Sequence, residues 1–286
     1  MIKDCFPYFN ERELLELRIN LLKDHVDEFV ITEADRTHSG IPKELTLSKT
    51  IDELGLPRDK IRIVTVNLPS KEELADDHER EHLQRDAAAE YIGYNDLAFV
   101  SDCDEIMNPS FIAYYAMVAK NNANSMLRLP MAFLMGRADL QAYDPLGKVI
   151  AWSPGFVCMG HHKEKYTLSQ IRESQSKGYF NIVYRDIFTM DGGVVQDAGW
   201  HFSWMGGGSR NQIKYKSFMH YQDDIPNSAG NGDKDALYEF IGNHEIKEGG
   251  TDPLGRGNHI MKKYDTSLLP KLVFDLPRVK DFLLPQ

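Results

Sequence analysis

Apolar residues recur with two different spacings along residues 1–124, and the alternation between them separates expected strands from expected helices. Continuous short apolar runs are typical of strands that are buried on both faces. They occur at Phe29–Thr32, Ile61–Val66 and Leu97–Val100. Segments with helical spacing lie around and between these runs. Strands that alternate with helices in this way predict an α/β fold with a mostly parallel, doubly wound sheet.

The expected helices each begin at a residue suited to cap the first turn. The caps are Asn10, Ser70 and Asn108, and the helices end near Leu22, Tyr91 and Lys120. Glutamates three residues after the first two caps, Glu13 and Glu73, have the spacing of a capping box. We therefore expect a core-facing first helix and a long, charged second one.

From residue 125 onward, the pattern changes to strands that are separated by turns. Strands are expected at Met126–Met135, Val149–Ser153 and Trp200–Trp204. The glycine-rich segment Gly206–Ser209 leads into an expected helix from Arg210 to about His220, and another helix is expected near Asp235–Ile246. This part of the chain is expected to be a mixed continuation of the same fold.

Composition excludes several classes of protein. The 286 residues are 42% apolar and 27% charged, which is typical of a soluble globular protein. A net charge of −10 argues against nucleic-acid partners, because phosphate binding needs a broad basic face. The three cysteines form no C-x-x-C pair and read as reduced thiols. With no long apolar segment, we expect a cytoplasmic protein without an integral membrane segment.

The most informative motif is Asp102-Cys103-Asp104-Glu105, directly behind the apolar run Leu97–Val100. A strand with this ending delivers its carboxylates to the carboxyl edge of the sheet, where α/β sheets bind ligands. Two close carboxylates favour a hard divalent cation that bridges to phosphate. A solvated turn is the alternative, since a second pair, Asp233 and Asp235, occurs where no strand precedes it.

Several ordered blocks of this sequence resemble glycosyltransferase family 17, which contains the β-1,4-mannosyl-glycoprotein β-1,4-N-acetylglucosaminyltransferases. They are Asp4–Phe6, Asn10–Glu11, Leu14–Arg18, Val26–Asp27, Phe29–Ala34, Thr37–Gly40, the acidic block Ser101–Ile106 and the Gly-Trp-His block Gly199–Trp204. The resemblance implies a GT-A-like α/β fold whose central, mostly parallel mixed sheet is flanked by helices. It also implies a single catalytic domain over residues 1–286.

Within that domain, we expect a nucleotide-sugar-binding half at 1–124, an acceptor-facing half at 125–262 and a C-terminal wrapping tail at 263–286. The resemblance implies a metal-dependent, inverting enzyme that uses a UDP-sugar donor, with GlcNAc as the sugar. Family members of the Golgi carry an N-terminal anchor, whereas this chain starts at the catalytic block. We therefore expect a soluble bacterial or viral-type member that acts on a glycan or a lipid-linked sugar.

The family chemistry suggests a role for each candidate cation ligand. Mn²⁺ or Mg²⁺ is expected at Asp104, with Asp102 at the metal or the ribose and His201 as a further ligand. Glu105 either orients these groups or is a second-layer or surface carboxylate. A buried histidine with ordinary hydrogen bonds is the alternative for His201. Trp200 and Trp204 either stack on a sugar or belong to the core.

Donor contacts are expected from Glu33 at the ribose or uracil, and from Arg85 at the diphosphate or the donor sugar. Lys214 and Lys216 are candidates for a lid over the leaving diphosphate. An exposed ion pair is the alternative for Arg85, and ordinary solvation for the two lysines.

The general base that deprotonates the acceptor hydroxyl is expected to be a carboxylate. Asp197 is the first candidate, because it lies just before the Gly-Trp-His block, and Asp252 is the second.

Two other classes of function stay open. A metal-dependent phosphohydrolase would also use Asp-x-Asp after a strand, although the aspartyl-phosphate type needs a Ser or Thr soon after Asp104 and the sequence has Glu105-Ile106-Met107. A catalytically inactive sugar- or nucleotide-binding protein is the second, and the presence of both Asp102 and Asp104 argues against it. An EF-hand is excluded because the Asp/Asn-x-Gly pattern and the distal Glu of its calcium-binding loop are missing here.

Overall fold

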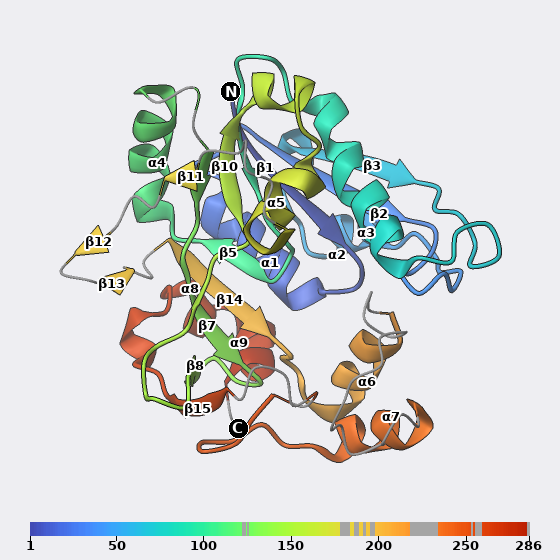
Figure 1. Cartoon of the computed structure of the whole chain (residues 1–286), viewed down its shortest axis with the longest axis vertical. Helices are drawn as coiled ribbons and strands as arrows, with labels where there is room; N and C mark the ends of the chain where they lie inside the picture. The colour runs from blue at the N-terminus through green and yellow to red at the C-terminus, as the bar shows by residue number, and fades with distance from the viewer. Residues whose placement is uncertain are drawn as a thin grey trace.

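The computed structural model describes residues 1–121, 124, 126–177, 184–185, 189–190, 193–194, 198–217, 234–252, 254 and 259–284. Two β-sheets lie one above the other in Figure 1. They meet where one strand of the larger sheet leads directly into the smaller sheet.

In the described part of the chain, the larger sheet has seven strands in the order β11-β6-β10-β4-β1-β2-β3. They are β1 (Ile2–Tyr8), β2 (Glu28–Ala34), β3 (Ile61–Val66), β4 (Leu97–Val100), β6 (Met126–Arg128), β10 (Phe156–Met159) and β11 (Tyr184–Arg185). Strands β3, β2, β1 and β4 are parallel, and β10 is antiparallel to both β4 and β6. The sheet is therefore mixed, with a parallel half that the N-terminal strands build.

Helices cover both faces of this sheet. One face packs against α1 (Arg12–Leu22), α2 (Leu47–Glu53) and α4 (Pro109–Asn121). The 3-10 helix η2 (Ala87–Tyr91) and α5 (Leu168–Lys177) pack against the other face. Successive strand residues point to opposite faces, so Cys5 and Phe6 of β1 belong to different apolar clusters.

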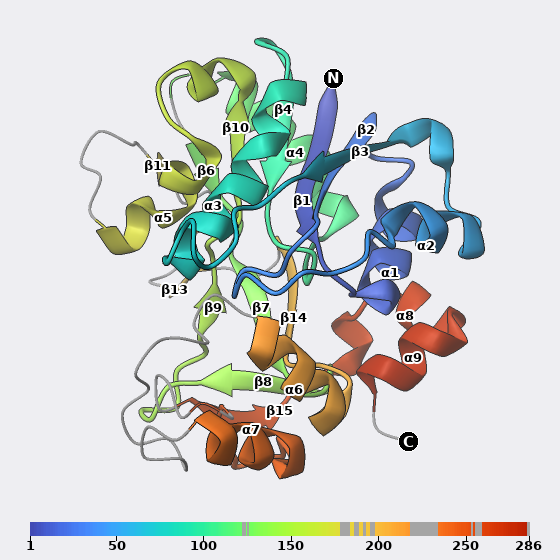
Figure 2. The ribbon, with the colours of Figure 1, turned by 90° about the vertical axis from the view of Figure 1, so that its right-hand side faces the viewer.

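The smaller sheet has the order β15-β8-β7-β14-β5 among the described residues, with β9 paired to β7. Its strands are β5 (Glu105–Met107), β7 (Met131–Met135), β8 (Leu140–Tyr143), β9 (Ala151–Trp152), β14 (Gly199–Ser203) and β15 (Ile260–Lys263). A separate pair joins β12 (Thr189–Met190) to β13 (Gly193–Val194). Helices α6 (Gly207–Ser217) and α7 (Lys234–Asn243) lie beside this sheet in Figures 1 and 2.

The C-terminal residues form α8 (Leu272–Asp275) and α9 (Pro277–Leu283), which contact α1. Figure 2 shows these two helices side by side beneath α1. The division at residues 124 and 262 stays a prediction. No described helix is both long enough and apolar enough to cross a membrane.

The predicted fold class is confirmed, because a central mixed sheet with a parallel half is flanked by helices. Most of the expected strands and helices are present within a few residues of their predicted bounds. Two predicted helix starts are wrong. Glu11, and not Asn10, stands at the N-cap of α1, and its carboxylate accepts hydrogen bonds from the backbone of Phe9 and Asn10.

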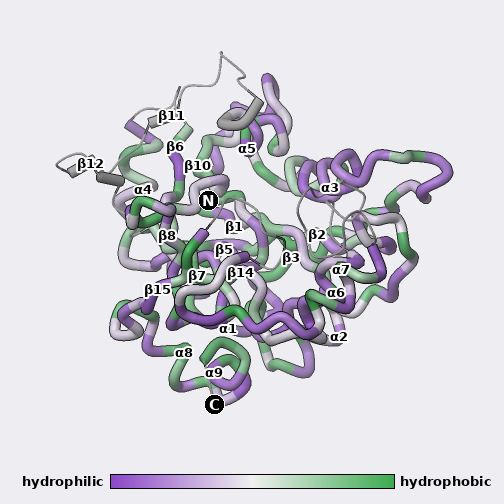
Figure 3. The backbone as a smooth tube through the Cα atoms, turned by 60° about the horizontal axis from the view of Figure 1, so that its bottom comes forward, coloured by the Kyte–Doolittle hydropathy of each residue, from purple (hydrophilic) through white to green (hydrophobic). Residues whose placement is uncertain are grey.

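The second wrong start concerns the charged helix. Ser70 and Glu73 do exchange hydrogen bonds, but they close an isolated turn. Helix α3 (Asp77–Asp86) begins after Asp76, whose carboxylate caps it by accepting from the His78 backbone. The helix is hydrophilic along its length in Figure 3.

Candidate active site

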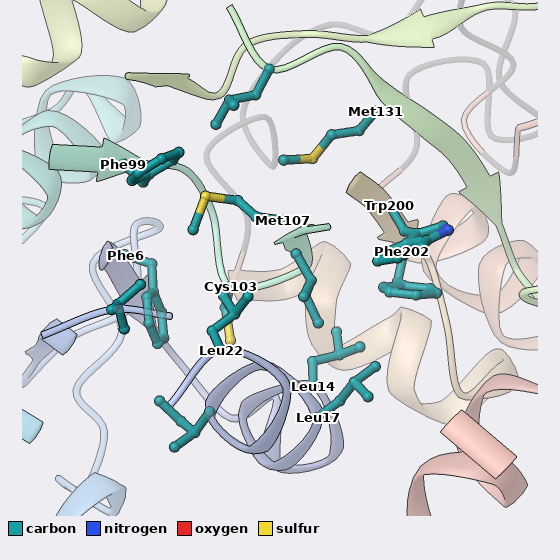
Figure 4. Packing of buried hydrophobic residues seen from close by; sticks show 14 of the residues in the cluster. Phe6, Leu14, Leu17, Leu22, Phe99, Cys103, Met107, Met131, Trp200 and Phe202 are labelled. Carbon is teal, nitrogen blue, oxygen red and sulfur yellow. The ribbon is translucent and has the colours of Figure 1, made fainter. Parts of the chain in front are cut away.

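The motif Asp102–Glu105 forms a turn, called here the acidic turn, which lies between the two sheets because it joins the end of β4 to the start of β5. Its second residue, Cys103, is 3% exposed and belongs to the main core. Figure 4 shows the Cys103 side chain beside Leu22 of α1. With Cys103 held in the core, Asp102 and Asp104 on either side of it line a cavity that opens away from the core.

A buried arginine fixes the shape of this turn. The Arg18 guanidinium is fully buried and forms a two-point pair with the Asp4 carboxylate, at 2.6 and 2.8 Å. It also donates to the backbone oxygens of Asp102 at 2.6 Å and Glu105 at 3.1 Å, and to the Ser101 hydroxyl at 2.8 Å. Planar, multivalent donation of this kind defines geometry better than a point charge does. The turn therefore rests on an ion pair that joins β1 to α1.

Asp102 and Glu105 share a second arginine. Arg172 of α5 donates to Asp102 at 2.5 Å and to both oxygens of Glu105, at 2.6 and 2.9 Å. Arg85 of α3 contacts the other oxygen of Asp102 at 3.1 Å and also pairs with Glu81. The Trp152 indole N–H donates to Glu105 at 2.6 Å. Asp102 and Glu105 are thus neutralised by side chains that come from helices far away in the sequence.

Arg172 controls the ionisation of Glu105. Burial raises the pKa of the Glu105 carboxyl, but Arg172 outweighs that effect and lowers the pKa to about 2. A carboxyl whose pKa is lowered by folding stabilises the protein above its unfolded pKa, near 4.3, and this stabilisation is lost as the pH falls through the folded pKa. Ionised Glu105 therefore stabilises the fold at neutral pH, and this stabilisation is lost in acid.

We expect Arg172→Met to lower the free energy of unfolding at neutral pH and to flatten or reverse its decline between about pH 5 and pH 2. Without Arg172, burial raises the pKa of Glu105. Acid then protonates this carboxyl and removes its unpaired buried charge. Urea unfolding across a pH series, followed by circular dichroism, measures both effects. Arg278→Met, which breaks the exposed pair with Glu16, is the control. An acid decline as steep in Arg172→Met as in the wild type would contradict this assignment.

Asp104 faces a different set of partners. Lys214 of α6 lies with its Nζ 2.9 Å from Asp104 Oδ2, and His201 Nε2 lies 3.6 Å from Asp104 Oδ1. Burial would raise the pKa of Asp104, but Lys214 and His201 hold it well below its usual range. Asp104 is therefore ionised throughout the neutral range.

His201 reaches this position because β14 pairs with β5, which sets His201 opposite Glu105. Its ring stacks on Trp152, at a centroid distance of 4.4 Å, and on Phe133, at 5.0 Å, and these two rings also contact each other at 5.0 Å. The side chain is buried, and its Nδ1 has no hydrogen-bond partner among the residues that the structure describes. Whether His201 is a metal ligand or a buried core histidine stays a prediction.

The donor groups here suit a divalent cation only in part. Among the described residues, no group of three or more His, Cys, Asp and Glu side chains is arranged to hold a metal ion. The carboxylate of Asp104 and the Nε2 atom of the His201 imidazole do face each other, at 3.6 Å. Both groups are suitable ligands, with phosphate and water as the remaining ones. Both Asp102 oxygens, in contrast, already bind arginines.

A cavity of about 130 Å³ opens beside Asp102 and Asp104. Its lining also includes the aromatic residues Tyr8 and Phe9, the polar residues Thr37, His38 and Gln84, and Lys214. His38 and Gln84 are hydrogen-bonded to each other at 2.9 Å. The cavity therefore runs from the acidic turn to an aromatic and polar end near the carboxyl ends of β1 and β2.

The structure places Arg85 beside Asp102 and His201 beside Asp104, while the roles predicted for these four residues stay predictions. Arg85 is 2% exposed, so it is not the exposed ion pair that was its alternative. Trp200 and Trp204 are buried core residues, at 6% and 2% exposure.

Other predicted donor contacts lie elsewhere. Glu33 does not line the cavity, and its carboxylate accepts the backbone N–H groups of Thr46 and Leu47 at the start of α2. Lys216 places its ammonium over the Tyr238 ring, 3.9 Å from the centroid, while Lys214 turns to Asp104. The roles predicted for Glu33 and Lys216 stay predictions.

Neither of the two candidate bases is among the described residues that line the cavity. Asp197 lies outside the described residues, as does Asp233 of the second acidic pair. Asp252 is 4% exposed, accepts a hydrogen bond from the Leu254 backbone and is not part of the cavity lining. Their assignment as bases stays a prediction.

Sequence reasoning missed four residues that shape the site: Glu81, Trp152, Arg172 and Arg18. The first three come from elements distant along the chain, and nothing local marks them. Arg18 did carry a signal, because it stands four residues from both Leu14 and Leu22 on the apolar face of α1. A charged residue at such a position requires a buried partner.

Comparison with known proteins supports the resemblance. Residues 2–135 match the model of glycosyltransferase family 17. No curated protein matches the sequence. Among solved structures, TarS residues 1–349 of S. aureus is similar with 13% identity and a TM-score of 0.42, over 85% of this chain and 71% of that one.

A second similar structure, 4-diphosphocytidyl-2C-methyl-D-erythritol synthase, has 12% identity and a TM-score of 0.35, over 64% of this chain and 87% of that one. At these scores, neither structure contributes to the assignment, which rests on the family match. The matched segment contains Arg18, Arg85 and the whole acidic turn. Residues 2–135, slightly under half of the chain, therefore match glycosyltransferase family 17, and this match supports a glycosyltransferase, an enzyme that moves a sugar from a donor to an acceptor.

Proposed function

We propose that this enzyme is a metal-dependent, inverting transferase that moves GlcNAc from UDP-GlcNAc to a hydroxyl of a glycan or a lipid-linked sugar. The observation that carries the proposal is the position of Asp104. This carboxylate is buried, ionised and flanked by His201 and Lys214 at the edge of the cavity. When the sugar is transferred, the nucleoside diphosphate leaves with a negative charge, and charged groups at this position are needed to stabilise it.

Asp104 and His201 would hold the cation, Mn²⁺ or Mg²⁺. When bound, such a cation neutralises the negative charge that develops on the leaving diphosphate. Asp102 and Glu105 have a different task, since Arg85 and Arg172 already bind them. This ion network holds the acidic turn in one conformation, so that Asp104 is aligned before the donor arrives.

The nucleoside would bind at the aromatic and polar end of the cavity. Tyr8 and Phe9 offer apolar ring surfaces, and Thr37 with the His38–Gln84 pair offers hydrogen-bonding groups. The lining of apolar surfaces with a few fixed polar groups is typical of small-molecule sites. The acidic turn, at the opposite end, would then face the diphosphate and the sugar.

An inverting reaction also requires a carboxylate that accepts the proton of the attacking hydroxyl. Asp197 stays our proposed base, with Asp252 as the second candidate. The exchange Asp197→Asn with retention of normal turnover would remove it from this role.

Hydrolysis of a panel of nucleotide sugars, with and without Mn²⁺, tests the proposal. We expect slow hydrolysis of a single UDP-sugar, UDP-GlcNAc, that needs Mn²⁺ and is lost in the double variant Asp102→Ala/Asp104→Ala. The nucleotide is separated by chromatography, with water as the acceptor. Cleavage of phosphomonoesters would favour a phosphohydrolase instead. Binding of UDP-GlcNAc with no turnover on any acceptor would favour a binding protein.

A further inference from the structure

Lys214 stands where a cation bound to Asp104 would meet another positive charge. Its Nζ is 2.9 Å from one oxygen of Asp104, and His201 Nε2 is 3.6 Å from the other. The ammonium and the imidazole thus share a single carboxylate. A divalent cation held by Asp104 and His201 would lie within a few ångströms of the Lys214 ammonium, where like charges repel strongly.

Two nearby carboxylates, Asp102 and Glu105, are already bound by arginines, and Glu11 lines the same cavity as Lys214. Arg85 and Arg172 already neutralise Asp102, and Arg172 also neutralises Glu105. Lys214 itself is 35% exposed at its side chain, so its flexible stem has room to move into the cavity that it lines. Its three N–H donors are suited to phosphate oxygens.

The helix that carries Lys214 is anchored at both of its ends. Arg210 pairs with Glu13 of α1 at 2.6 Å, and the Ser39 hydroxyl donates to the Lys216 backbone oxygen at 2.6 Å. Helix α6 follows Gly206, whose φ of 88° favours glycine. Because these anchors hold the backbone, the movement required of Lys214 is a movement of its side chain alone.

We propose that Lys214 competes with the divalent cation for Asp104 and that the donor diphosphate ends this competition by binding Lys214. The proposal rests on the proposed function, because it assumes a cation and a diphosphate at this site. Before the donor binds, the ammonium weakens cation binding at Asp104. With the diphosphate present, Lys214 has a new partner, and the cation and the nucleotide strengthen each other's binding.

The test is Mn²⁺ binding, followed by electron paramagnetic resonance with and without UDP. We expect Lys214→Met to bind Mn²⁺ alone about tenfold more tightly than the wild type, since a charge of equal sign is removed next to Asp104. UDP should strengthen Mn²⁺ binding by the wild type about tenfold more than it does for Lys214→Met, because only the wild type has an ammonium to release. Lys214→Arg keeps the charge and should behave like the wild type.

Lys271→Met is the matched control, because Lys271 pairs with Asp275 on the surface as Lys214 pairs with Asp104 in the site. Circular dichroism confirms that each variant is folded. An Mn²⁺ affinity of Lys214→Met equal to that of the wild type, with UDP still promoting Mn²⁺ binding, overturns the inference and leaves the proposed function standing. If no variant binds Mn²⁺ even with UDP, the proposed function is wrong, and the inference fails with it.

Discussion

Replacement of Asp104 by asparagine is expected to lower sugar transfer by about 10²-fold to 10³-fold, the loss typical of removing a preorganised electrostatic group. The exchange keeps the size of the side chain but removes the charge that faces Lys214 and His201. The exchange should lower kcat and leave the thermal stability of the protein close to that of the wild type. Initial rates with UDP-GlcNAc and a thermal melt of each protein measure the two quantities.

The control for this experiment is Asp52→Asn, which neutralises an aspartate that is 65% exposed and pairs with Arg58 on the surface. Its rate should equal that of the wild type. If Asp104→Asn transferred sugar at the wild-type rate, the acidic turn would have no electrostatic role in the reaction. A loss of rate with an equally large loss of folded protein would point to structure instead.

The largest loss of stability is expected for Arg18→Met. Removing one partner of a buried ion pair leaves an uncompensated charge, which typically costs about 3–5 kcal/mol. Here the charge left behind is Asp4, which is fully buried, and three acceptors around the acidic turn each lose one donor as well. Urea unfolding at neutral pH gives the change in unfolding free energy.

A double variant separates the ion pair from the packing of its side chains. With Asp4→Asn added to Arg18→Met, the combined loss should be smaller than the sum of the two single losses, because the second exchange removes the stranded charge. Additive losses would show that Arg18 and Asp4 do not depend on each other. The exposed pair Lys271–Asp275, treated in the same way, should show little coupling.

The variants Arg18→Met and Asp104→Asn affect the same acidic turn from opposite sides. Arg18 holds its backbone from the core, while Asp104 presents its charge to the cavity. The position of the carboxylate is therefore a consequence of the buried ion pair below it. An arrangement of this kind keeps the reacting groups in place without using mobile loops.

The parallel half of the larger sheet was readable because β2 and β4 are buried on both faces, while the edge strand β3 is half-buried and still mostly apolar. Strands β2, β3 and β4 appear in the sequence as nearly unbroken apolar runs. Strand β1 was missed, because Lys3 and Asp4 interrupt its run. Both are buried and paired, Lys3 with Glu28 and Asp4 with Arg18. A charged residue in a strand usually indicates an exposed position, and the sequence alone does not show that its charge is paired in the core.

The site was predictable to the extent that its residues lie on contiguous segments. Asp102 and Asp104 follow a strand, and His201 belongs to a recognisable block. Arg172 could not be found, since α5 meets the acidic turn only through the packing of α5 on the sheet. The start of α3 was misplaced for a local reason, because the Ser70–Glu73 capping box closes a turn and no helix follows at once.

The most direct test is the location of Mn²⁺ by anomalous diffraction from crystals grown with Mn²⁺ and UDP. We expect an anomalous peak bound by Asp104 and His201, with the diphosphate of UDP beside it and the Lys214 ammonium on a phosphate oxygen. A peak at any other position, or UDP bound away from the acidic turn, would contradict this expectation.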